Sequence, residues 1–350
     1  MIIELSLQLL LVILALLFIV LIGFMLYIFF QRQREVAFNK SRDLYLKDYS
    51  KLWYDYFFKN NEIFSVVLIP RGKPQVKAIE IIFSSYLKNI TNEEITQKMK
   101  DFSNLYLKQF YEKDLMSKRW SIRMNALYRI AELQIDELLD ACRKLEETNY
   151  SKEEFFQLLK IYSIFQPELF IQKIKVLNTH YAESEYRRLF VLLEEDVFIQ
   201  FFEDFTSWPA SIQFAVIDTA GAKRNMKYID KLEQLLMNDN DEIKIRALKG
   251  LFEIGVIENI DPYIPFVTSD VWEVRLMIGK IFKYVPLAYT FPYLKQLLQD
   301  ENWWVRNQAA KTIAEDRDGI EKLKEFITYS KDAYALEMAQ EVITRKQGSR

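Results

Sequence analysis

The chain has 350 residues, of which 50% are hydrophobic and 27% charged, with 8 glycines and 8 prolines. This composition excludes a disordered protein and an all-β protein, because apolar residues are abundant and chain breakers are scarce. The single cysteine, Cys142, and the single histidine, His180, exclude a disulfide scaffold and a Cys/His zinc site. The formal charge of −2 argues against a protein that coats nucleic acid, so we expect no nucleic-acid partner.

The first thirty residues contain one long apolar segment. Residues 5–30 carry no charge, and Ser6 and Gln8 are their only clearly polar side chains. A helix of this length reaches roughly 39 Å, which exceeds the ~30 Å hydrocarbon core of a bilayer. The segment is too long for a signal peptide, and its length also disfavours an ordinary buried core helix. We therefore predict a transmembrane helix over 5–30 that contacts membrane lipid.

The charges on either side of this segment predict its orientation. Before it, the only charged residue is Glu4. After it come four basic residues, Arg32, Arg34, Lys40 and Arg42. Because basic residues stay on the cytoplasmic side, we expect a single-pass protein of the cell membrane, with residues 1–4 outside and the C-terminal domain in the cytoplasm. Residues 31–120 hold 17 basic and 11 acidic side chains, an excess that suits an anionic leaflet and is also within ordinary scatter.

Residues 31–73 are predicted to form a juxtamembrane helix and a linker. Over 35–59, apolar side chains recur at helical spacing, namely Tyr45, Tyr49, Leu52, Trp53 and Tyr56. Such a stripe either packs on the first repeat of the following domain or lies against lipid headgroups, and we favour packing. A turn signal at 70–74 ends the linker, and helical patterns follow over 75–89 and 92–114.

Four short stretches match one another when they are aligned on an arginine. They are Trp120-Ser121-Ile122-Arg123, Ile243-Lys244-Ile245-Arg246, Trp272-Glu273-Val274-Arg275 and Trp303-Trp304-Val305-Arg306. The last three arginines are each followed after four positions by a small residue, Gly250, Gly279 or Ala310, and preceded in the turn by Asp241, Asp270 or Asp300. The repeat unit is about 30 residues long and has no strand pattern. Such units are pairs of helices, which stack because neither helix buries its apolar face alone.

The repeat therefore predicts an all-α protein, in which an N-terminal transmembrane helix precedes an α-solenoid of about seven or eight helical pairs. We place the solenoid at 74–344 and a disordered tail at 345–350. Trp120, Trp272 and Trp303 all lie three residues before the arginine, which predicts a shared architectural role in the repeat core. Trp304 points ~100° away from its neighbour around a helix. It is the candidate contact to a partner, although packing is the favoured interpretation because large aromatic side chains are usually mostly buried.

The helix, the aspartate-containing turn and the Trp/Ile-x-Val/Ile-Arg stretch resemble HEAT repeats, in the short bacterial form that also occurs in phycobilisome-lyase-like proteins. The resemblance is good over about 228–315 and fair at 118–131. It implies an internal ladder in which turn aspartates pair with helix arginines of neighbouring repeats. Its members are Arg246, Arg275, Arg306, Asp241, Asp270 and Asp300, with Arg123 in the earlier copy. Their role is then structural.

No group of residues in the sequence is typical of catalysis. His180 lies in a predicted loop, with no nucleophile or orienting group evident beside it. Cys142 lies in a helical pattern that predicts a small core residue. Neither glycine-rich phosphate-binding pattern occurs in the sequence. We therefore expect no enzyme activity and no cofactor or metal.

These features predict a membrane-anchored scaffold or adaptor at the cytoplasmic face, which binds a partner protein through a HEAT-like solenoid. A membrane-embedded enzyme of envelope assembly is one candidate partner, on the membrane setting alone. Two alternatives stay open, a lyase or chaperone for a bilin chromophore and a DNA-binding HEAT-like protein. Against the second, residues 121–350 hold 30 basic and 37 acidic side chains.

Overall fold

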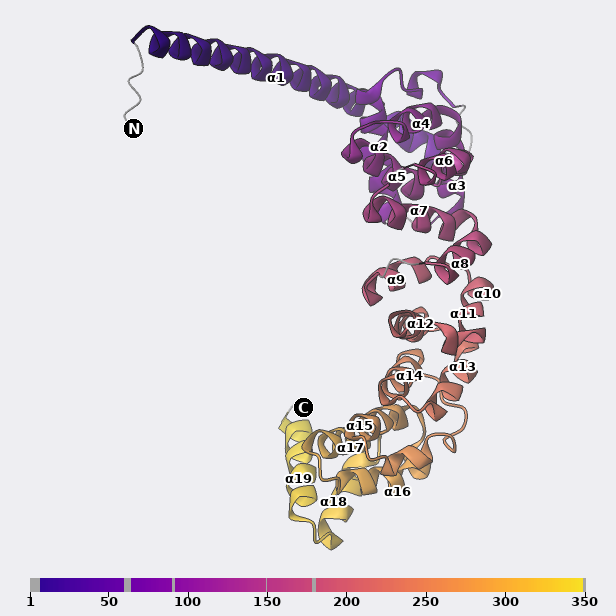
Figure 1. The fold of residues 1–350 in the computed structure, drawn as a ribbon. Coiled ribbons are helices and arrows are strands. Elements are labelled where there is room, and N and C mark those ends of the chain that lie inside the picture. The colour runs from indigo at the N-terminus through magenta and orange to yellow at the C-terminus, as the bar shows by residue number, and fades with distance from the viewer. Residues whose placement is uncertain (1–6, 60–63, 90–91, 149, 178–180, 349–350) are drawn as a thin grey trace. The chain divides into compact units, whose positions relative to one another are not determined.

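A computed structural model describes residues 7–59, 64–89, 92–148, 150–177 and 181–348. Within these ranges the chain consists of helices and connecting turns, without a strand, so the predicted all-α fold class is confirmed. The helices form two compact units, which we call unit 1 (Met1–Ile161) and unit 2 (Tyr162–Arg350). Figure 1 shows the order of the helices along the chain, from indigo in unit 1 to yellow at the end of unit 2.

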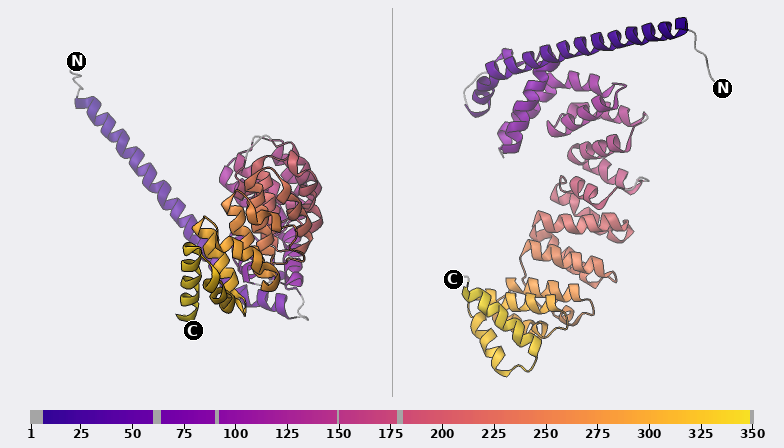
Figure 2. Two further views of the ribbon diagram at one scale, coloured as in Figure 1. Left: turned by 90° about the horizontal axis from the view of Figure 1, so that it is seen from below. Right: turned by 90° about the vertical axis from the view of Figure 1, so that its left-hand side faces the viewer.

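Unit 1 begins with one long helix, α1 (Leu7–Phe58), which projects from the other helices of the unit (Figures 1 and 2). It contains most of the predicted transmembrane segment and nearly all of the predicted helix over 35–59. The two are continuous because the sequence from residue 24 to residue 69 has no glycine or proline to end a helix. Every side chain over 10–30 is exposed. Of the helices that the structure describes, α1 is the one long and apolar enough to cross a membrane.

The other helices of unit 1 are shorter. They are η1 (Val66–Leu68), α2 (Lys73–Asn89), α3 (Glu93–Phe102), η2 (Ser103–Leu107), α4 (Lys108–Leu115), α5 (Trp120–Glu132), η3 (Asp136–Leu138), α6 (Leu139–Glu146) and α7 (Lys152–Phe165). The predicted helix over 92–114 corresponds to α3, η2 and α4 together. η2 is a π-helical turn, in which each backbone hydrogen bond joins residues five apart in the sequence. The helix therefore accommodates an extra residue without ending. The unit boundary falls inside α7.

The last turns of α1 pack into the core of unit 1. Trp53 is fully buried, and its ring lies edge-on to Phe83 of α2 and Phe102 of α3, with ring centroids 4.9 and 4.8 Å away. The Trp53 indole N–H donates to the hydroxyl of Tyr45 (3.2 Å), which donates to the carbonyl oxygen of Leu68 (2.7 Å). The aromatic stripe of α1 therefore packs on protein, and its polar atoms are satisfied inside the unit.

Unit 2 contains the three C-terminal copies of the repeat. Its helices are α8 (Pro167–Lys175), α9 (Glu183–Phe190), α10 (Glu195–Phe198), α11 (Gln200–Glu203), η4 (Phe205–Ser207), α12 (Ala210–Lys223), η5 (Met226–Tyr228), α13 (Ile229–Gln234), η6 (Leu235–Met237), α14 (Asp241–Ile254), η7 (Ile264–Thr268), α15 (Trp272–Ile281), η8 (Phe282–Tyr284), α16 (Leu287–Leu298), α17 (Trp303–Glu315), α18 (Gly319–Tyr329) and α19 (Ala333–Gly348).

Most helices of unit 2 lie in two layers (Figures 1 and 2). One layer consists of α9, α12, α14, α15, α17 and α19, each packed against the next. The second layer includes α13 on α14, α16 on α17, and α18 on α17 and α19. Aliphatic and aromatic side chains fill the space between them. Unit 2 is thus a stack of helical hairpins, in which each hairpin buries its apolar face against its neighbours.

The helices α12 and α14 approach closely because two glycines face each other. A methyl group on Gly221 would lie 2.7 Å from the Cα atom of Gly250. Gly250 is the small residue that follows Arg246 by four positions. At the corresponding position in α15, Gly279 has ordinary space, since an added methyl group would lie 3.5 Å from its nearest neighbour. The small residue of the repeat is therefore required for close helix packing between α12 and α14.

The C-terminal helix extends further than predicted. α19 continues through Gly348, so residues 345–348 of the expected disordered tail are helical; residues 349–350 lie outside the described part of the chain. Val342 and Ile343 are buried, and Lys346 donates a hydrogen bond to the backbone of α17. These contacts hold the last turns of α19 against the stack.

Replacing Gly221 by alanine should destabilise unit 2 by about 1–3 kcal/mol, because the added methyl group overlaps the backbone of α14. Gly279→Ala is the matched control, since its new contact is ordinary and alanine favours the helix by up to about 1 kcal/mol. The measurement is urea unfolding of the full chain in detergent micelles, followed by tryptophan fluorescence. Equal unfolding midpoints for the two variants would contradict the close packing of α12 on α14.

Candidate functional site

The repeat arginine of unit 1 joins two helices. Arg123 of α5 donates through Nε (2.6 Å) and Nη2 (3.2 Å) to the carboxylate of Glu154 on α7, which is fully buried. Its Nη1 donates to the carbonyl oxygen of Ser117 in the turn before α5 (2.9 Å). The sequence interpretation missed Glu154. The sequence does contain a pattern that could have identified this residue, the Ser-x-x-Glu spacing of a capping box. Ser151 and Glu154 form that box at the start of α7.

Arg275 has the same arrangement in unit 2. Its Nε and Nη2 donate to the two carboxylate oxygens of Asp300, at 2.5 and 2.9 Å, and its Nη1 donates to the carbonyl oxygen of Ser269 at 2.6 Å. Both charged side chains are buried. The hydrogen bond to Asp300 raises the pKa of the Arg275 guanidinium. A bidentate, charge-assisted pair therefore links α15 to the turn before α17.

Arg246 departs from the predicted ladder. It donates to Glu183 of α9 (2.7 Å), to Asp218 of α12 (2.9 Å) and to Glu242 in its own helix (2.5 Å). Its guanidinium also lies 4.4 Å from the ring centroid of Phe214. Arg246 thus links α14 to two earlier helices of the same layer. Arg275 instead binds the turn before α17, the next helix of that layer.

The reason for this difference lies in the turn before α15. Asp300 stands three residues before the first residue of α17, and the corresponding place before α15 is held by Ser269. Serine has no carboxylate to offer Arg246. The other two predicted ladder aspartates have local roles: Asp241 pairs with a lysine of its own helix (2.8 Å), and the Asp270 carbonyl oxygen accepts from Arg275 (3.3 Å).

Arg306 of α17 shows a third arrangement, and it is only 9% exposed. Its Nη1 donates to the carbonyl oxygens of Asp300 (2.7 Å) and Glu301 (2.9 Å). Its guanidinium lies 5.3 Å from the ring centroid of Tyr334 on α19. Its Nε is buried and has no hydrogen-bond partner among the described residues, in contrast to Nε of Arg275. No carboxylate in the described part of the chain pairs with Arg306.

The repeated tryptophans are not core residues, which corrects the prediction. Trp120 is 47% exposed, Trp303 is 43% exposed, and Trp272 is half-buried. Each is the first residue of its helix, where a side chain points back over the preceding turn and away from the hairpin interface. The buried place comes two residues later, at Val274 and Val305.

Trp304, the candidate partner contact, is 60% exposed. Its ring lies perpendicular to that of Trp303, with centroids 4.8 Å apart. Tyr334, at the start of the neighbouring helix α19, is 69% exposed. We call Trp303, Trp304 and Tyr334 the aromatic patch. Large aromatic side chains gathered on a surface are typical of protein contact sites.

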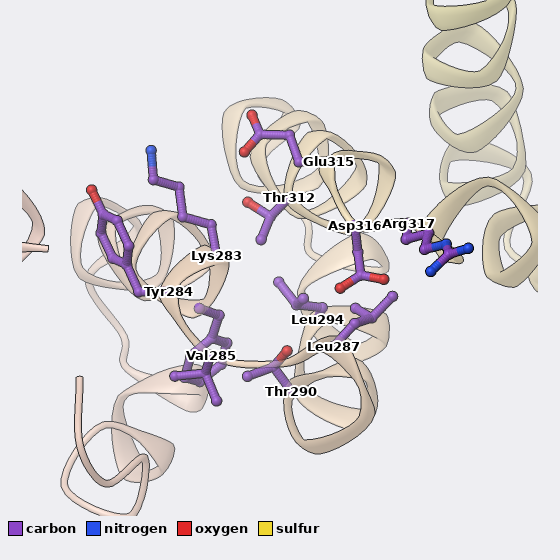
Figure 3. A pocket seen from close by; sticks show the side chains of 11 residues that line it. Lys283, Tyr284, Val285, Leu287, Thr290, Leu294, Thr312, Glu315, Asp316 and Arg317 are labelled. Atoms are coloured by element: carbon purple, nitrogen blue, oxygen red, sulfur yellow. The ribbon is translucent and has the colours of Figure 1, made fainter. Parts of the chain in front are cut away.

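A pocket of about 430 Å³ lies in unit 2 among η8, α16 and α17 (Figure 3). Lys283 and Arg317 contribute two cations to its lining, and Glu315 and Asp316 contribute two carboxylates. The hydroxyl of Thr290 is buried beside it and has no partner among the described residues. The other threonine hydroxyl of the lining, on Thr312, donates to the carbonyl oxygen of Gly279 (2.7 Å), so neither threonine hydroxyl is bonded to a carboxylate among the described residues.

Two further residues were candidates for reactive chemistry in the sequence, Cys142 and His180. Cys142 is buried in α6, and burial raises the pKa of its thiol to about 12, so it stays protonated at neutral pH. Over the described ranges there is no cluster of three His, Cys, Asp or Glu residues that could hold a metal ion. His180 lies outside the described residues.

Replacing Arg275 by alanine should destabilise unit 2 by about 3 kcal/mol, because it leaves the buried Asp300 carboxylate without its cation. Arg345→Ala removes an exposed i,i+4 pair with Glu341 and should cost at most about 0.5 kcal/mol. Urea unfolding of both variants in micelles gives the comparison. Similar free energies of unfolding for the two variants would show that the buried pair contributes no more than a surface pair.

Comparison with known proteins gives a family match at the C-terminal end of the stack. Residues 291–315, which include Trp303, Trp304 and Arg306, match the HEAT repeat model. No curated protein matches the sequence. A solved crystal structure of an engineered protein is 14% identical over 78% of this chain and 80% of that chain, with a TM-score of 0.32, which is too low to bear on the fold. The family match and the all-helical stack of hairpins together support a HEAT-repeat protein.

Proposed function

We propose that this protein is a membrane-anchored scaffold, which binds a partner protein through the hairpin stack of unit 2. The observation that carries the proposal is the aromatic patch, in which three large aromatic side chains are exposed on neighbouring helices. Aromatic anchors of this kind dominate the binding energy of protein interfaces. The buried ion pair Arg275–Asp300 fixes the turn from which Trp303 and Trp304 project, so this tryptophan pair is preorganised and loses little entropy on binding.

The membrane anchor in this proposal is the N-terminal part of α1. Residues 7–30 reach roughly 36 Å as a helix, enough to cross a ~30 Å hydrocarbon core. The apolar side chains over 10–30 are exposed, which is costly in water and favourable in lipid. The helix then continues without a break to Tyr45, where the core of unit 1 begins. The roughly 14 residues between hold that core about 21 Å from the membrane.

The proposed orientation places units 1 and 2 in the cytoplasm. The basic residues that follow Phe30 support it, since such residues are retained on the cytoplasmic side. We propose a partner at or in the same membrane, and the membrane setting makes an enzyme of envelope assembly the candidate to test first. The excess of acidic over basic residues in 121–350 disfavours the DNA-binding alternative, and nothing in the described structure favours a bilin lyase.

Reporter fusions at Arg350 test the topology. A green fluorescent protein fused there should fluoresce, and an alkaline phosphatase, which needs an oxidising compartment, should be inactive. The reason is the basic flank after Phe30. The matched control reverses the charges of Arg32, Arg34, Lys40 and Arg42 to glutamate, and this change should weaken the orientation. Phosphatase activity in the unaltered chain would overturn the cytoplasmic placement and the scaffold model with it.

Replacing Trp304 by alanine should weaken capture of the partner in intact cells by about 2 kcal/mol, roughly 30-fold in Kd, because a hot-spot aromatic is removed. Cross-linking followed by mass spectrometry measures the captured partner. Tyr289→Ala is the control, since Tyr289 is exposed on α16, outside the patch. Circular dichroism establishes that both variants fold. A folded Trp304→Ala chain that captures its partner normally would exclude the patch as the docking site.

A further inference from the structure

The repeat arginines Arg123, Arg275 and Arg306 share one hydrogen-bonding pattern with a single exception; Arg275 and Arg306 are buried, and Arg123 is half-buried. In each, Nη1 donates to the carbonyl oxygen six residues earlier, in the turn before its own helix. In Arg123 and Arg275, the edge formed by Nε and Nη2 holds a carboxylate from the next helix or its turn. In Arg306, Nε is buried and unpartnered in the described structure, and no carboxylate pairs with the guanidinium.

The sequence explains the exception. Asp300, the partner of Arg275, stands three residues before the first residue of the following helix, α17. The residue three positions before α19 is Ser330. Its hydroxyl accepts a hydrogen bond from the amide of Asp332 (3.3 Å), and no hydrogen bond joins it to Arg306 in the described part of the chain. Asp332 itself is engaged as the cap of α19, since its carboxylate accepts from the amides of Tyr334 and Ala335.

Leaving such a cation without a counterion inside a protein is unfavourable. Burying a charged group costs several kcal/mol unless a partner compensates it. The Tyr334 ring offers part of this compensation through a cation–π contact, which is weaker than a bidentate carboxylate. Because Tyr334 is largely exposed, it is free to move aside. The Nε edge of Arg306 is therefore suited to a carboxylate that arrives from outside the described chain.

We infer that Arg306 is a receptor for an acidic side chain of the partner protein, seated under Tyr334 at the edge of the aromatic patch. This inference rests on the proposed scaffold function and names the chemistry of its partner. A carboxylate fits better than a phosphate because the equivalent edges of Arg123 and Arg275 both hold carboxylates.

Ser330→Asp is the decisive variant, because it places a carboxylate where the preceding repeat has Asp300. It should fill the Arg306 edge from within the chain, raise the unfolding midpoint by several degrees, and block an incoming carboxylate. Ser330→Asn is the neutral control of the same shape. Removing Arg306 itself is less informative, because its Nη1 also satisfies two backbone carbonyl groups.

The probe is N-acetyl-glutamate α-amide, which carries one side-chain carboxylate, with the corresponding glutamine amide as its neutral match. Each is titrated at constant ionic strength into the full chain in micelles, and tryptophan fluorescence is the readout because Trp303 lies one turn from Arg306. The wild type and Ser330→Asn should bind the glutamate probe and not the glutamine probe. Ser330→Asp should lose at least tenfold in affinity while remaining folded.

Three outcomes of the titration would overturn the inference. They are equal binding by Ser330→Asp and wild type, equal response to the glutamine probe, and tighter binding of inorganic phosphate than of the glutamate probe. Partner capture separates this inference from the scaffold proposal. If Ser330→Asp captures its partner normally and Trp304→Ala does not, the inference about Arg306 and an acidic side chain is wrong. The proposal that the aromatic patch is the docking site would still stand.

Discussion

At one level of unit 2, a buried bridge between Arg275 of α15 and Asp300 beside α17 fixes how two neighbouring hairpins pack. A helical hairpin of about 30 residues has one apolar face and is stable only when it packs on a neighbour. Apolar packing alone allows neighbouring helices to slide, because it has no direction. The bidentate pair of Arg275 and Asp300 adds direction, since its fork fits one relative position of α15 and α17. Nη1 of Arg275 also satisfies a turn carbonyl that helix formation leaves unpaired.

A second contact, the Nη1 hydrogen bond of Arg123, Arg275 and Arg306 to the turn before each helix, is common to the three helices that begin with tryptophan. With the arginine bound to the turn, the first residue of the helix lies three positions before the arginine. Its side chain lies outside the hairpin interface. The repeat places tryptophan there in α5, α15 and α17, and α17 adds a second tryptophan beside it. A rigid exposed aromatic pair therefore arises from the same geometry that holds the hairpins together. The proposed binding surface and the structural framework share one repeat motif, which is the basis of the scaffold proposal.

The sequence predicted the helical class, the hairpin stack and the register of the repeat arginines, because these follow from local periodicity and from matching stretches. It did not predict the carboxylates of Arg123 and Arg246, because Glu154 and Glu183 are brought to them by packing between segments 31 and 63 residues apart. It assigned Trp303 to the core because repetition shows a shared position in the motif and does not show burial. It separated two N-terminal helices that are one, although the absence of glycine and proline between them was visible.

The central claim is that the buried arginine–carboxylate bridge couples successive hairpins, beyond the contribution of each residue alone. A double-mutant cycle of Arg275→Ala and Asp300→Ala measures this coupling directly, through the free energies of urea unfolding of the four chains. The account predicts a coupling energy of about 2–3 kcal/mol, because each single change leaves a buried charge unpaired and the double change leaves none. Additive effects within about 0.5 kcal/mol would show that the two residues act independently and would contradict the account.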